Sequence, residues 1–170
     1  MMVKWIGALF IILSCFSFGI IFSLSYKKEL NSLNALIHTL DFMECELQFR
    51  MTPLPELCRK TAMETDGVLR KVFTELSNEL EDQISPDVQS CMYCVINRIP
   101  NIPQTTKESL NLLGKNLGRF DLQGQLRGLE TVREESRIKL NKLLMNSDTK
   151  IKSYQTIGLC AGAALVILLI

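Results

Sequence analysis

The chain has 170 residues, and 19 Lys and Arg residues against 18 Asp and Glu residues give it a net charge of +1. This balance excludes a strong electrostatic field of the kind that gathers nucleic acid or an acidic substrate. Both ends of the chain are apolar, and the residues between them suffice for about one ordinary domain with a single core.

The first predicted element is an N-terminal transmembrane helix, residues 1–24. The stretch from Trp5 to Leu24 holds no charged residue, and as a helix it would cover about 30 Å, the thickness of a bilayer's hydrocarbon core. A cleaved signal is the alternative, because Lys4 gives a basic start and the residues before Cys15 loosely resemble a lipoprotein cleavage box. The apolar run continues well beyond Cys15, which favours the membrane span.

Helical periodicity dominates the region that follows. Thr52 and Pro53 supply a cap and a first-turn proline for a second helix that begins near Leu54, and Gly67 is expected to end or bend it. The first stripe, with alternating steps of three and four, is Leu33, Leu36, Leu40, Met43 and Leu47; the second is Leu54, Leu57, Cys58 and Ala62; the third is Leu69, Val72, Phe73, Leu76 and Leu80.

Three further helices are predicted after residue 82. Ser85 and Pro86 are expected to begin the fourth, and Thr105 or Thr106 to cap the fifth. Gly118 suits the left-handed position at a helix end, and Asp121 suits the N-cap of the sixth. The fourth helix is expected to close at Pro100 and Pro103, the fifth carries Leu110, Leu113 and Leu117, and the sixth carries Leu122, Leu126, Leu129, Leu140, Leu143 and Ile151.

The C-terminal segment, residues 157–170, is apolar and free of charge but falls about 9 Å short of a full span. We favour a transmembrane helix here over an embedded tail or a helix packed in a complex. Lys27 and Lys28 follow the first apolar segment, and Lys150 and Lys152 precede the second, so residues 25–156 are expected to form a cytoplasmic helical domain. The fold class is therefore all-α: an antiparallel bundle of about six helices flanked by N- and C-terminal transmembrane helices.

Cysteine spacing gives the one alternative chemistry. Cys91 and Cys94 are separated as in thiol redox pairs and in half of a zinc site. A redox pair requires that spacing at a helix N-terminus, however. Cys91 instead lies on the apolar face of a helix that is expected to begin earlier in the sequence. His38, Cys45 and Cys58 match no common zinc-ligand spacing. A thiol-redox or zinc-binding membrane protein that uses Cys91 and Cys94 stays the second hypothesis.

The sequence predicts no catalytic, metal-binding or cofactor-binding residue. His38 is the single histidine, and no glycine-rich phosphate-binding run is present, so neither an enzyme nor a small-molecule substrate nor a cofactor is expected. Mixed charges on the sixth helix predict a solvated face, with a docking face for another protein as the alternative. These residues are Arg127, Arg133, Arg137, Lys139 and Lys142, interleaved with Glu130, Glu134 and Glu135.

The layout resembles the stage III sporulation protein AB family over essentially its full length. The resemblance rests on the opening Lys4 to Gly7, the turn at Thr52, Pro53 and Leu54, the run from Gly114 through Leu117 and Gly118 to Asp121, and the apolar end. At the matching positions Thr52, Pro53, Gly114, Gly118 and Asp121 the implied roles are capping and turn geometry.

This resemblance implies a component of the channel or secretion-like complex between mother cell and forespore, held in the mother-cell-derived outer forespore membrane. The family is also distantly similar to the inner-membrane platform proteins of type II secretion. The implied partners are other stage III sporulation channel proteins, including the stage III sporulation protein AA ATPase, which would dock on the cytoplasmic domain.

Overall fold

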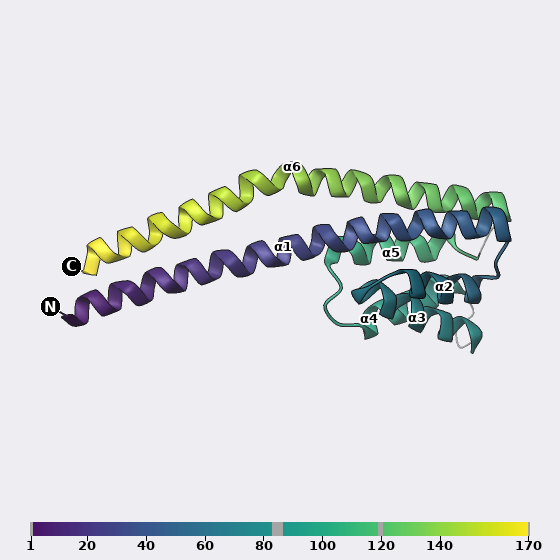
Figure 1. Cartoon of the computed structure of the whole chain (residues 1–170), viewed down its shortest axis with the longest axis horizontal. Helices are drawn as coiled ribbons and strands as arrows, with labels where there is room; N and C mark the ends of the chain where they lie inside the picture. Colours follow the sequence, from purple (N-terminus) through teal and green to yellow (C-terminus); the bar gives the residue numbers. More distant parts are fainter. Residues whose placement is uncertain (1, 83–86, 119–120, 170) are drawn as a thin grey trace. The chain divides into compact units, whose positions relative to one another are not determined.

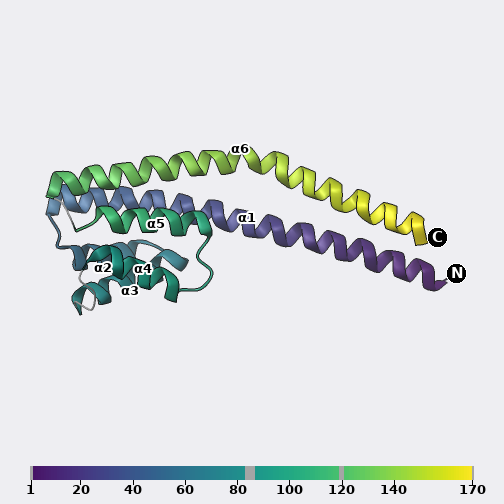
Figure 2. The same cartoon turned by 180° about the vertical axis from the view of Figure 1, so that it is seen from behind.

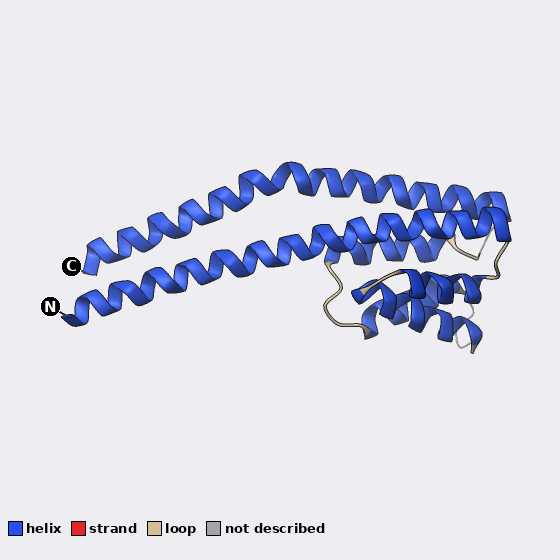
Figure 3. Cartoon of the chain, in the orientation of Figure 1, coloured by secondary structure: helices blue, strands red, loops and turns tan. Residues whose placement is uncertain are grey.

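A computed structural model describes the backbone of residues 2–82, 87–118 and 121–169, and the side chains of residues 25–82, 87–118 and 121–145. These residues form helices joined by short loops, without a strand (Figure 3). The predicted all-α class is confirmed. The helices are α1 (Met2–Arg50), α2 (Leu54–Glu64), α3 (Gly67–Glu81), α4 (Val88–Arg98), α5 (Gln104–Asn116) and α6 (Leu122–Leu169).

The chain forms two compact units. One consists of Met1–Lys28 together with Lys142–Ile170, and the other is Glu29–Asn141. In the first unit the N-terminal part of α1 and the C-terminal part of α6 run beside each other. The two chain termini lie at the same end of this pair (Figures 1 and 2). The Tyr26 hydroxyl donates a hydrogen bond to the Leu143 carbonyl across this pair.

Candidate membrane spans are not found among the residues whose side chains are described, because no helix there is both long and apolar enough. The two predicted spans, residues 1–24 and 157–170, lie outside these residues. Their assignment as transmembrane helices stays a prediction.

Unit 29–141 is a two-layer helical domain. One layer holds α5 beside the portions of α1 and α6 that belong to this unit, and α2, α3 and α4 form the other (Figures 1 and 2). The start of α5 is joined to α1, because the Thr105 and Thr106 hydroxyls donate hydrogen bonds to Glu29 and Ser32. Lys139 pairs with Glu108 at 3.5 Å, and Gly128 packs on Asn116, so α6 runs antiparallel to α5.

The core of this domain is built from the predicted stripes. The α1 stripe from Leu33 to Leu47 is buried throughout, and Phe73 is the bulkiest side chain without solvent exposure. On α6 the buried positions include Val132 and Ser136, which the leucine pattern did not indicate. The remaining apolar core positions on α2 to α6 include Leu57, Cys58, Leu69, Val72, Leu76, Cys91, Met92, Val95, Leu110, Leu113, Leu117 and Leu129.

Candidate docking surface

The corner between α1 and α2 is organised by a buried carboxylate rather than by a helix cap. The Thr52 hydroxyl donates to Glu46 Oε2 at 3.1 Å, and both side chains are buried. Pro53 occupies the N-cap position of α2 and makes no side-chain hydrogen bond there. The prediction that Thr52 caps α2 is therefore wrong, because the buried Glu46 carboxylate takes its hydroxyl. Met51 turns the chain with a φ of 48°, a left-handed value for a residue with a side chain.

Glu46 is also the centre of an ion cluster that links α1 to α2. Its carboxylate accepts a hydrogen bond from Lys60 Nζ at 3.0 Å and pairs with Arg50 at 3.2 Å. The Lys60 ammonium holds the pKa of Glu46 below its usual value, although burial acts in the opposite direction. The ion cluster thus offsets the free-energy cost of burying Glu46, the only buried carboxylate among the described residues of α1.

The corner between α5 and α6 holds the second group of motif positions. Leu117 is buried and leaves the helical conformation, and Gly118 follows with a φ of 77°. Asp121 Oδ1 accepts a hydrogen bond from the Gly124 N–H at 2.9 Å, which is the geometry of an N-cap. This corner therefore has the form of one helix end followed by one helix start. The role of its residues as family motif positions stays a prediction.

Gly114 marks a close crossing of two helices. A Cβ atom at Gly114 on α5 would lie 2.8 Å from Met92 Cβ on α4. Real side chains do not approach so closely, so only glycine permits this spacing of α4 and α5.

The two cysteines of the spaced pair lie in different environments. Cys91 is buried, Cys94 is exposed, and neither forms a disulfide. Helix α4 begins at Val88, with Asp87 accepting from the Ser90 N–H at 3.1 Å, so it starts later than expected; Ser85 and Pro86 lie outside the described residues. Across the described side chains, no three His, Cys, Asp or Glu residues are grouped as metal ligands would be.

The charged side chains of α6 are less uniformly solvated than predicted. Arg133 has only 18% of its side chain exposed, and it pairs with Asp41 of α1 at 3.1 Å and with Glu44. Lys139 pairs with Glu108 of α5 and with Glu135. Arg133 and Lys139 therefore turn inward and join α6 to its neighbours, whereas Arg127 and Arg137 are exposed as expected. His38 is exposed on α1.

A surface groove lies between α2 and α3, and the sequence pattern did not predict it. Met63 lies in it with 70% of its surface exposed. Arg59 and Arg70 also line the groove, and Arg70 pairs with Asp66 at 2.7 Å. An exposed methionine between basic side chains suits contact with another protein. The full lining is Arg59, Ala62, Met63, Arg70, Thr74, Ser77, Asn78 and Glu81.

Comparison with known proteins decides the family. The family model described as stage III sporulation protein AB matches residues 4–170. The chain belongs to the stage III sporulation protein AB family. The resemblance seen in the sequence is thereby confirmed, and the protein is a sporulation component.

A solved structure also resembles this member of the stage III sporulation protein AB family. It is a stage III sporulation protein AB (SpoIIIAB), with a TM-score of 0.63 and 16% sequence identity over 72% of this chain and 98% of that chain. At this identity the likeness shows the shared fold. No curated protein matches the chain.

Proposed function

We propose that this protein is a non-enzymatic, membrane-anchored component of the channel or secretion-like complex between mother cell and forespore. Family membership supports the role in sporulation. The observation that carries the anchoring is that α1 and α6 each continue as a single helix through an apolar stretch without charged residues, 5–24 in α1 and 157–169 in α6. In this proposal the helical domain faces the mother-cell cytoplasm, and the anchor lies in the mother-cell-derived outer forespore membrane.

We further propose that the helical domain docks the stage III sporulation protein AA ATPase and other subunits of the complex. The groove between α2 and α3 supports such a contact because it combines the exposed Met63 with Arg59 and Arg70. Arg59 has no ion-pair partner among the described residues, so its charge is available to an acidic group on a partner.

Docking predicts that the full chain, reconstituted in membrane vesicles, retains the purified ATPase during co-sedimentation. A double variant with glutamate at both Met63 and Arg59 should retain at least about tenfold less ATPase. Apolar and arginine contacts at the centre of an interface dominate its affinity. Arg127→Glu is the matched control, since Arg127 is exposed on α6 outside the groove. Equal retention by both variants would exclude the groove, and no retention by the unmodified chain would exclude docking.

Topology gives a second test of the same proposal. Asn78 on α3 is exposed and lines the groove. A cysteine at Asn78, in a chain without other reactive thiols, should stay protected from an impermeant reagent in intact cells, whereas a cysteine added at the C-terminus should be labelled. Labelling at Asn78 in intact cells would place the domain outside and contradict the proposal.

A further inference from the structure

The most exposed residues of α1 are uncharged along about five turns of the domain. Between residues 31 and 49, none of the α1 residues that are exposed as a whole is Asp, Glu, Lys or Arg; Asp41, whose side chain is 42% exposed, is half-buried and pairs with Arg133. By contrast, α6 exposes Arg127, Glu130, Glu134 and Arg137 to solvent. A solvated helix face normally carries such charges, so the α1 face is unusual. Its exposed residues are Asn31, Asn34, Ala35, His38, Cys45, Gln48 and Phe49.

Within this face, five residues follow the spacing of a helix-pairing seam. Their steps alternate between three and four, as at the contact positions of a coiled coil. They lie on the side of α1 opposite the buried stripe that contains Leu36 and Leu40. Phe49 has 78% of its surface exposed, and Phe42 is half-buried. We call this set the uncharged seam: Ala35, His38, Phe42, Cys45 and Phe49.

The acidic residues beside the uncharged seam already have partners within the chain. Asp41 and Glu44 bind Arg133 of α6, and Glu46 binds Lys60 of α2. Asp41 borders the seam on the side of its partner Arg133 of α6. No α1 acid in this stretch is therefore left to select a basic partner. What fits the seam is an uncharged helix face of matching spacing.

We propose that the uncharged seam pairs with the same seam of a second copy of this chain. In a two-fold dimer each residue near the axis faces its own copy, so a charged residue there would meet a like charge. The absence of charge from Ala35 to Phe49 removes this repulsion, and the Phe42 and Phe49 rings supply the apolar contact. Two chains held in one membrane would also meet at high effective concentration.

The two copies pair in parallel, because a shared membrane anchor points both α1 helices in one direction; this part rests on the proposed anchoring. In parallel register each contact residue lies beside its own copy, so the two Cys45 thiols come within reach of a disulfide. In antiparallel register about Phe42, Cys45 would face His38 instead. Disulfide formation at Cys45 therefore reports both the seam and its direction.

The first test is oxidative cross-linking of the full chain in vesicles. One variant carries C15S, C94S and C160S and keeps Cys45 as its exposed thiol; the matched control carries C15S, C45S and C160S and keeps the exposed Cys94 of α4. Cys58 and Cys91 are buried and stay in both. We expect the Cys45 variant to form covalent dimer at least ten times faster than the Cys94 control.

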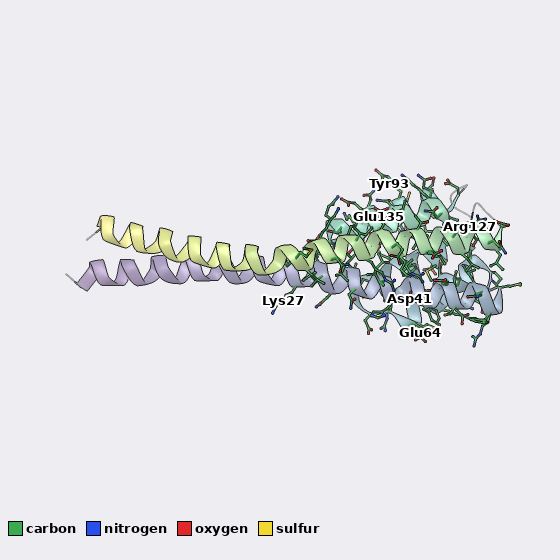
Figure 4. The ribbon with its side chains drawn as sticks, turned by 90° about the horizontal axis from the view of Figure 1, so that it is seen from above. Lys27, Asp41, Glu64, Tyr93, Arg127 and Glu135 are labelled. Carbon is green, nitrogen blue, oxygen red and sulfur yellow. The ribbon has the colours of Figure 1, made fainter. Side chains whose placement is uncertain are left out.

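The second test measures the mass of the full chain in detergent by light scattering. Phe49→Asp should convert a dimer into a monomer, whereas Tyr93→Asp should not. Tyr93 is a matched control because it is an aromatic residue with 62% exposure on α4, at the edge of the domain away from Asp41 (Figure 4).

Three outcomes decide the proposal. Fast Cys45 cross-linking with a Phe49-dependent dimer mass supports it. A monomeric mass for the unmodified chain, with Cys45 reacting no faster than Cys94, overturns it. A Phe49-dependent dimer that does not cross-link at Cys45 overturns the parallel arrangement. These readouts do not involve the ATPase, so a failure here is distinguishable from a failure of docking.

Discussion

Replacing Gly118 with alanine is expected to lower the free energy of unfolding by about 2 to 5 kcal/mol. Gly118 has a φ of 77°, a left-handed conformation that costs a residue with a Cβ about 1 to 2 kcal/mol. A Cβ there would also lie 2.5 Å from Cγ2 of Val88, and overpacking of this kind costs about 1 to 3 kcal/mol. Val88 cannot easily rotate away, because β-branched side chains are restricted at χ1. Unfolding of the full chain in detergent, followed by circular dichroism, measures the loss.

Gly67→Ala provides the matched control for this prediction. Gly67 has a φ of 65°, but a Cβ there would meet nothing within 4 Å. Gly67→Ala should therefore cost only the conformational part, about 1 to 2 kcal/mol. The difference between the two variants isolates the contact with Val88. Equal losses would show that the corner between α5 and α6 adjusts around the new methyl group.

Alkaline pH is expected to destabilise the domain through the buried thiol of Cys58. Cys58 has no solvent exposure, and burial raises its pKa from 9.0 to about 12. Well below pH 9 the thiol is protonated in both the folded and the unfolded chain. Between pH 9 and pH 12 the unfolded chain releases this proton and the folded chain keeps it. The free energy of unfolding should therefore fall by up to about 1.4 kcal/mol per pH unit as the pH rises through this window.

Cys58→Ala separates this effect from other alkaline titrations. The variant is less stable at neutral pH, because it leaves a small cavity between α2 and its neighbours. Its free energy of unfolding should nevertheless decline less steeply than that of the unmodified chain between pH 9 and pH 11. Denaturant titrations at four pH values give both slopes. Parallel slopes would mean that Cys58 does not contribute to the pH dependence.

The helices and most of the core were predictable because large apolar residues recur with helical spacing. Leu33, Leu36 and Leu40 on α1 are buried as their spacing indicates. On α6 the same reasoning was less complete, because part of its inward face is made of small residues such as Gly128 and Ser136. Small residues permit close helix approach without contributing to a leucine stripe, so pattern matching overlooks them.

Polar side chains with a choice of partners were harder to predict. A Thr before a Pro usually indicates a helix cap, but Thr52 bonds the buried Glu46 instead. Likewise, Arg133 is one of several cations along α6, and only the fold places it against Asp41 and Glu44. The α2–α3 groove and the uncharged seam also required the structure, because the sequence does not show which apolar residues other helices leave uncovered.

The hydrogen bonds of Glu29 have a mechanical consequence. The Glu29 carboxylate on α1 accepts hydrogen bonds from both the N–H and the hydroxyl of Thr105 at the start of α5. The distance from the Thr105 nitrogen to Glu29 Oε1 is 3.3 Å. Neighbouring residues along a helix are offset by about 1.5 Å, so sliding α1 along α5 by a single residue would lengthen and misalign both hydrogen bonds. A force that pulls along α1 is therefore transmitted in part to α5, and the Glu29–Thr105 contact resists sliding of one helix along the other.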